Sequence, residues 1–136
     1  MTTSRKIFIN LSVADLPKTL QFWEGLGFGF NDQFTDDHAA CMVLNEDAFV
    51  MLLDRQRFSD FTKKDIANAR THTEVINALS AENREDVDTL VKAAFAAGAA
   101  PANDPMDYGF MYGWSFQDLD GHQWEVIWMD PAAVTA

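Results

Sequence analysis

Apolar and polar residues alternate near the start of the chain and then change to a helical spacing. Residues 6–13 predict a strand, with Phe8 and Asn10 on the same face. Residues 16–25 predict a helix, because they have a broad apolar face and two glycines at their end. Asp15 is suited to cap the start of this helix. Short strands are then expected near residues 28–34, 39–44 and 48–54, followed by a polar crossover loop over 55–70 with about one helical turn.

The second half of the chain repeats this order of elements. Residues 71–80 predict a strand, and Asn83 with Asp86 resembles a capping pair that opens a helix ending at Gly98. Further strands are expected over 109–117 and 122–129, joined by a tight turn at 118–121. Two strand–helix–strands modules predict an α+β fold, in which two curved mixed sheets surround a cleft and the helices lie outside.

Composition narrows the class of protein. The chain has 136 residues and a net charge of −11, and its few basic residues are scattered, which argues against a nucleic-acid partner. Cys41 is the only cysteine, so an intrachain disulfide or a cysteine-based zinc cluster is excluded. The first residues are polar and no apolar run reaches membrane-spanning length, so we expect a cytoplasmic protein without a membrane partner.

Two segments carry a resemblance to a known family. NLSVADLPKTLQFWEGLGF at residues 10–28 and FQDLDGHQWEVIWMDP at residues 116–131 resemble the vicinal oxygen chelate superfamily of glyoxalases, bleomycin resistance proteins and extradiol dioxygenases. The resemblance implies a single domain over 1–136, made of two βαβββ modules. These modules would span about 5–55 and 71–130, joined by a crossover over 56–70, and the protein would be a homodimer.

The resemblance also implies four metal-ligand positions facing the cleft. By motif spacing they fall on Phe8, Met51, Ile76 and Glu125. Glu125 alone carries a donor suited to a divalent ion, and one carboxylate beside three apolar side chains cannot hold such an ion usefully. We therefore expect no metal cofactor.

A displaced ligand set is the alternative. His72 and Glu74 share strand parity with Ile76, so with Glu125, and with Asn10 as a further donor, they could bind Zn²⁺, Ni²⁺, Fe²⁺ or Mn²⁺ one rung further out. A shift of two residues moves a ligand by roughly 6–7 Å along a strand, which favours the interpretation without a metal. His38, in an acidic turn, is expected at the surface.

The cleft would then be a mostly apolar ligand site. The predicted ligand-binding residues are Phe8, Asn10, Met51, Glu74, Ile76, Tyr112 and Glu125. These side chains suit metal-independent binding of a small apolar or aromatic molecule. The alternative is an enzyme of the glyoxalase, lyase, isomerase or dioxygenase type. It would use either the displaced metal set or Glu125, whose charged form is disfavoured by apolar surroundings, as acid or base.

Overall fold

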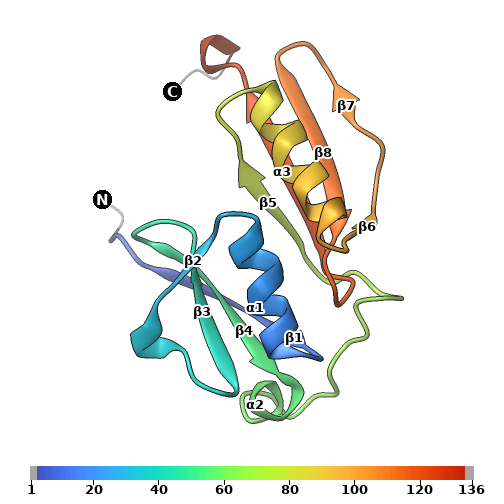
Figure 1. The fold of residues 1–136 in the computed structure, drawn as a ribbon. Coiled ribbons are helices and arrows are strands. Elements are labelled where there is room, and N and C mark those ends of the chain that lie inside the picture. The colour runs from blue at the N-terminus through green and yellow to red at the C-terminus, as the bar shows by residue number, and fades with distance from the viewer. Residues whose placement is uncertain (1–2, 134–136) are drawn as a thin grey trace. The chain divides into compact units, whose positions relative to one another are not determined.

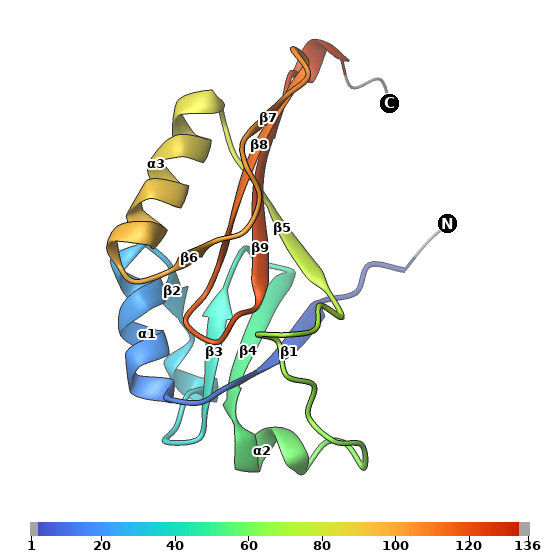
Figure 2. The same cartoon turned by 90° about the vertical axis from the view of Figure 1, so that its right-hand side faces the viewer.

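The computed structural model describes residues 3–133, so the first two residues of the polar start of the chain lie outside the described residues. The chain forms two compact units, Met1–Ala67 and Asn68–Ala136. Each unit is a sheet with one long helix against one of its faces (Figures 1 and 2). Within residues 3–133, the structure contains no helix with the length and apolar character needed to cross a membrane.

The first unit contains a four-stranded mixed sheet. Its elements are β1 (Ile7–Val13), α1 (Leu16–Gly25), β2 (Gly29–Phe30), the 3-10 helix η1 (Asp32–Phe34), β3 (Ala39–Val43), β4 (Ala48–Asp54) and α2 (Arg55–Ser59). The strand order is β1-β4-β3-β2. β1 runs parallel to β4, whereas β4 with β3 and β3 with β2 are antiparallel.

The second unit repeats this plan. Its elements are β5 (Ile76–Ser80), α3 (Arg84–Ala96), β6 (Ala100–Pro101), β7 (Met106–Asp107), β8 (Met111–Gln117), β9 (Gln123–Met129) and the 3-10 helix η2 (Pro131–Ala133). The strand order is β5-β9-β8-β6, with β7 pairing beside β8. β5 is parallel to β9, and the other pairs are antiparallel. The predicted α+β fold with an internal repeat is therefore confirmed.

Each sheet buries the face that its helix covers. In the first unit, Trp23 of α1 is fully buried, as are Val50 and Leu52 of β4. In the second, Val91 of α3 and Trp124 of β9 are also fully buried. Burying a side chain of this size stabilises a fold by roughly 1.5–3 kcal/mol. Because strand side chains alternate, the opposite face of each sheet carries the other half of the residues.

The helices begin where the sequence predicts. Asp15 accepts a hydrogen bond from the backbone N–H of Lys18, and α1 occupies the predicted segment. Asn83 accepts from the N–H of Asp86, while the carboxylate of Asp86 accepts from the N–H of Glu82. This reciprocal pair satisfies backbone donors that the first turn of α3 cannot satisfy itself.

Three predicted strands are too long. The strand expected at 28–34 ends at Phe30, because the side chain of Asn31 accepts from the N–H of Gln33 and starts η1 instead. The strand expected at 71–80 begins only at Ile76, because residues 71 and 72 turn back onto the carbonyl of Asn68. The strand expected at 109–117 begins at Met111. The short strands β6 and β7 were not predicted.

The predicted turn at 118–121 is built around a buried carboxylate. Asp118 is 6% exposed and accepts from the N–H groups of Asp120 and His122 and from the indole Nε1 of Trp124, at 2.9–3.0 Å. Gly121 has a φ of 92°, and a Cβ there would lie 3.0 Å from backbone atoms of Arg70. Burial raises the pKa of Asp118, and the donors around the carboxylate oppose that effect.

We expect Trp124→Phe to lower the free energy of unfolding by about 1–3 kcal/mol, because it removes one donor from a buried carboxylate. Urea denaturation measures this change. Trp114→Phe is the control for lost ring area, since Trp114 makes an edge contact with Phe95. An equal or larger loss in the control would contradict the role assigned to the indole N–H.

Candidate functional site

The uncovered face of the first sheet carries two of the predicted site residues side by side. Asn10 of β1 pairs with Met51 of β4. Phe8 pairs with Phe49 in the same two strands, and their rings stack with centroids 4.9 Å apart. The amide of Asn10 donates to the carbonyl of Phe8 at 3.1 Å, and its Oδ1 is an acceptor.

A pocket of about 340 Å³ opens on this face. Its apolar lining consists of Phe34, Ala39, Met51, Leu53 and Phe61. Its polar lining consists of Asn10, Gln33, Thr35, Asp36 and Arg57. Strands β1, β3 and β4 therefore supply the floor, while η1 and the region around α2 supply the walls.

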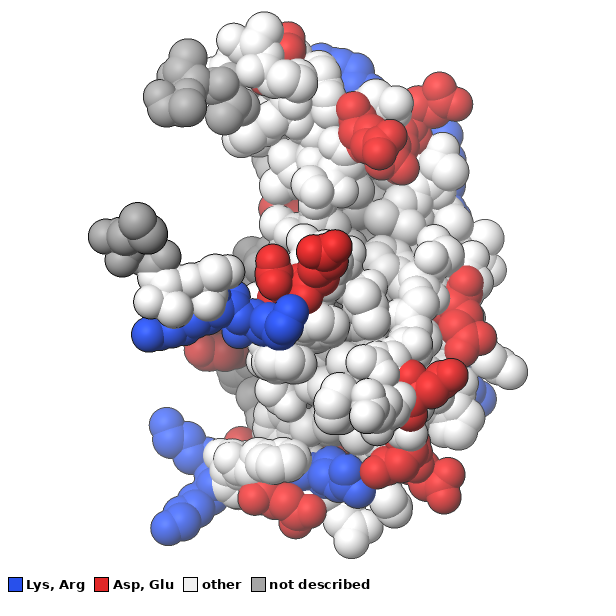
Figure 3. All heavy atoms as spheres, turned by 90° about the vertical axis from the view of Figure 1, so that its left-hand side faces the viewer, with Lys and Arg blue, Asp and Glu red and all other residues white. Residues whose placement is uncertain are grey.

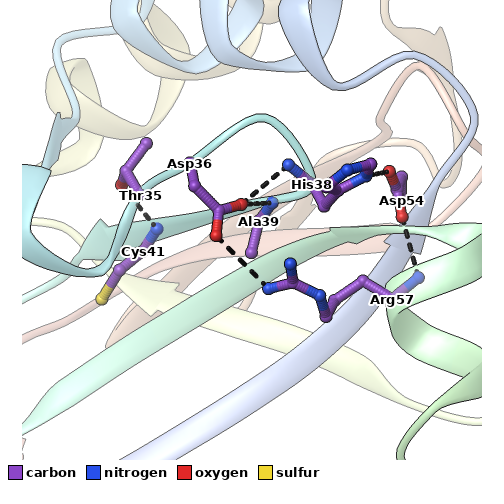
Figure 4. Close-up of polar contacts among 7 residues, drawn as sticks. All are labelled: Thr35, Asp36, His38, Ala39, Cys41, Asp54 and Arg57. Carbon is purple, nitrogen blue, oxygen red and sulfur yellow. Dashed lines mark hydrogen bonds and ion pairs between the residues drawn. The ribbon is translucent and has the colours of Figure 1, made fainter.

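A network of carboxylates fixes the wall of this pocket (Figure 4). Asp36 accepts from the backbone N–H groups of His38 and Ala39 at 2.8 and 3.0 Å, which shapes the turn before β3. Asp54 accepts from the backbone N–H of Arg57 at 2.8 Å and lies 2.6 Å from Nδ1 of His38. This second carboxylate therefore ties the turn to the first residues of α2.

Both carboxylates favour the charged state. The hydrogen bond from the N–H of His38 holds the pKa of Asp36 below its usual value of 3.8; burial opposes it, and the charge of Arg57 and the N–H of Ala39 lower the pKa further. The N–H of Arg57, and then the hydrogen bond with His38, lower the pKa of Asp54. Both groups are therefore negatively charged at neutral pH.

The sequence reading placed His38 at the surface and missed its pairing with Asp54, although half of its side chain is indeed exposed. It also assigned no site role to Arg57. The one available signal was Asp54 itself, because an Asp directly before a polar segment is a typical helix N-cap. The pairing with His38 joins residues 16 positions apart and depends on the register of β3 against β4.

In the second unit, Glu125 and Ile76 lie on the uncovered face of the sheet. Glu125 pairs with Ala78 of β5 on one side and with Ser115 of β8 on the other, and Ile76 pairs with Gln123. Glu125 borders a hollow of about 40 Å³, together with Met106, Trp114 and Ile127 among others. A hollow of this size admits water but not a substrate.

His72 and Glu74 lie in the irregular segment before β5. Strand parity therefore does not apply to them, and the geometric basis of the displaced metal set is lost. Nδ1 of His72 lies 2.8 Å from the hydroxyl of Thr71. Within residues 3–133, no group of three or more His, Cys, Asp or Glu side chains is arranged to hold a metal ion.

Tyr112 lies on the helix-covered face of the second sheet, opposite to Glu125 in strand parity. Its hydroxyl donates to Asp88 of α3 at 2.6 Å. The guanidinium of Arg84 lies 5.3 Å from the Tyr112 ring and 5.2 Å from the Trp128 ring. Tyr112 therefore joins β8 to α3, and we leave it out of the candidate site.

The four positions that the family resemblance assigns to metal ligands do not fit a divalent ion. Phe8 and Ile76 have no donor atom, and the thioether of Met51 is a soft donor that such ions bind poorly. Glu125 is the single suitable donor among the four. These four side chains would therefore not hold a divalent ion.

Comparison with known proteins now identifies the class. Residues 7–126 match the model of the Glyoxalase/Bleomycin resistance protein/Dioxygenase superfamily. The chain therefore belongs to this superfamily. No curated protein matches the sequence.

Solved structures agree with this assignment. A hypothetical protein from S. aureus is 29% identical, with a TM-score of 0.77 over 93% of this chain and 95% of that one. A glyoxalase-related enzyme from Fulvimarina pelagi is 19% identical, with a TM-score of 0.78 over 93% and 88%. TnmS3, an antibiotic binding protein from Streptomyces sp. CB03234, is 17% identical, with a TM-score of 0.66 over 95% and 98%. The last two likenesses show the fold alone.

The charge of Asp54 should stabilise the pocket wall in a pH-dependent way. Because the folded state lowers its pKa from 3.8, the stabilisation is complete above that value and is lost as the pH falls through the lower, folded value. We expect Asp54→Asn to lower the melting temperature at about pH 6 and to have a smaller effect at about pH 3. Asp37→Asn, an exposed carboxylate of the same turn, is the control. Equal effects of the two variants would contradict the assignment.

The hydroxyl of Tyr112 should lose its proton at a higher pH than that of an ordinary tyrosine. The hydrogen bond to Asp88, with burial and the charge of that carboxylate, raises the pKa of Tyr112 to about 12. The chain has two tyrosines, so Tyr108→Phe isolates Tyr112 in a titration of phenolate absorbance, with circular dichroism reporting the folded state. Stability from this bond is complete below the ordinary value of 10.0 and is lost as the pH approaches 12. Asp88→Asn should move the midpoint down, and a midpoint near 10 in folded Tyr108→Phe would refute the bond.

Proposed function

We propose that this chain binds a small apolar or aromatic molecule without a metal, in the pocket on the uncovered face of its first sheet. The observation that carries the proposal is the pocket itself. Apolar and polar residues line it in equal number, and its volume of about 340 Å³ suits a small organic ligand.

Two of the residues predicted from the sequence, Asn10 and Met51, line this pocket. Met51 offers a flexible, polarisable surface for an aromatic ring, and Asn10 offers an acceptor that can orient a polar substituent. A structural neighbour with the same fold is described as an antibiotic binding protein, which is consistent with a binding function for this chain. The apolar side chains at three of the four metal positions are consistent with the absence of metal chemistry.

We favour ligand binding over acid or base catalysis by Glu125. The hollow beside Glu125 has room for water only, and it is lined mainly by apolar groups. An acid or base needs its substrate within hydrogen-bond reach, and Glu125 does not line the larger pocket of the first unit. We further propose that the protein works in the cytoplasm, as the polar start and the lack of a membrane-spanning apolar run suggest. From the family resemblance we also propose a homodimer, which sedimentation analysis would test.

The neutral fluorescent probe N-phenyl-1-naphthylamine tests the proposal. We expect saturable binding with one site per chain, unchanged by EDTA. Phe61→Ala should weaken it about tenfold, because the lost ring contact amounts to roughly 1–1.5 kcal/mol. Phe61 is 73% exposed, so its truncation should not unfold the chain.

Phe110→Ala is the matched control, since Phe110 is 52% exposed and does not line the pocket. It should leave the affinity for the probe unchanged. Probe binding that EDTA abolishes, or that both variants reduce equally, would contradict the proposal. Saturating probe should also raise the melting temperature of the wild type, since a ligand that binds the folded state stabilises it.

A further inference from the structure

Arg57 is the one cationic residue among the described residues that line the pocket of the first unit. The geometry points to a ligand that is an aromatic acid, with its ring between the exposed phenyl groups of the pocket and its anionic group on Arg57. This inference rests on the proposed function and adds the chemical class of the ligand. The chain as a whole has a net charge of −11, which mildly disfavours an acidic ligand unless a local cation offsets it.

The backbone of Arg57 is fixed before any ligand arrives. Its N–H donates to the carboxylate of Asp54 at 2.8 Å, and Asp54 is held in turn by His38 (Figure 4). The Arg57 side chain is 32% exposed and lines the pocket. A cation placed in this way loses less conformational entropy on binding an anion than a freely moving one would.

The guanidinium of Arg57 retains donors for a ligand. Within residues 3–133, its Nη1 lies 3.5 Å from Oδ2 of Asp36, which is the upper limit for a hydrogen bond. A guanidinium has five N–H groups in a planar fork that matches a carboxylate. One long contact therefore leaves most of the fork available.

Asp36 does not need Arg57 as its partner. Its Oδ1 already accepts two backbone hydrogen bonds, from His38 and Ala39, and these hold the turn. Its charge does oppose a bound anion, because it lies beside the same guanidinium. Asp36 should therefore weaken the binding of an acid, and removal of its charge should strengthen that binding.

The aromatic part of the ligand is indicated by the two exposed phenyl rings on the pocket walls. Phe34 is 59% exposed and Phe61 is 73% exposed, although the pocket beside them leads to the buried floor at Ala39. A planar ring placed there would remove apolar surface from water on both sides. Asn10 lies on the floor beside Met51, where it can accept a hydrogen bond from a ring substituent.

On the face shown in Figure 3, acidic and basic side chains occur in several separate groups, with uncharged surface between them. Such surface charges are screened over about 8 Å at physiological salt. The local pair of Arg57 and Asp36 should therefore decide whether the pocket accepts an acid.

Isothermal titration calorimetry with 2-naphthoate and 2-naphthamide tests the inference, because these two probes differ in charge and share the ring. We expect the wild type to bind the naphthoate about tenfold more tightly than the naphthamide. Arg57→Gln should abolish this preference, and Arg57→Lys should retain part of it. Asp36→Asn keeps an Oδ1 acceptor for the turn and should strengthen naphthoate binding several-fold.

Arg55→Gln is the control, because Arg55 is an exposed neighbour in α2 that does not line the pocket. It should keep the preference for the acid. Equal binding of both probes to the wild type, or equal loss in Arg55→Gln and Arg57→Gln, would overturn the inference and leave the proposed function standing. Failure of both probes and of N-phenyl-1-naphthylamine to bind would refute the proposed function and the inference with it.

Discussion

Each sheet of this protein is covered by a helix on one face, and the rest of the structure depends on that burial. Trp23 in the first unit and Trp124 in the second have no exposed surface, and both belong to the layer between helix and sheet. Because side chains alternate along a strand, filling this layer leaves every second residue on the other face. The second face is therefore available for binding, and on the first sheet it carries the pocket that contains Asn10 and Met51.

The pocket wall is positioned by carboxylates that bind backbone N–H groups. Asp36 shapes the turn before β3, and Asp54 caps α2 while it holds His38. Turns of this kind have few apolar contacts, so side-chain-to-backbone bonds determine their geometry. The same contacts place Arg57 next to a pocket with apolar walls, which gives the site a cation and a nearby opposing charge.

The chain belongs to the superfamily by its fold. Three of the four positions that the resemblance assigns to metal ligands nevertheless carry apolar side chains. The fold needs an order of strands and helices, and this chain retains it from residue 7 to residue 126. Metal binding needs donor atoms at four positions, and Phe8, Met51 and Ile76 do not supply donors that a divalent ion binds well. A fold can therefore be kept while its chemistry changes, and function must be argued from the site.

The sequence by itself determined the repeat, the helix caps at Asp15 and Asn83, and the strand faces, because these follow from local spacing and capping chemistry. It also placed Asn10 and Met51 on one face, and the register of β1 with β4 confirms that they are neighbours. Tertiary structure decided the rest. The pairing of His38 with Asp54, and the position of Arg57 beside Asp36, depend on strand register and on side-chain contacts between segments distant in sequence. Such contacts leave no periodic signal along the chain.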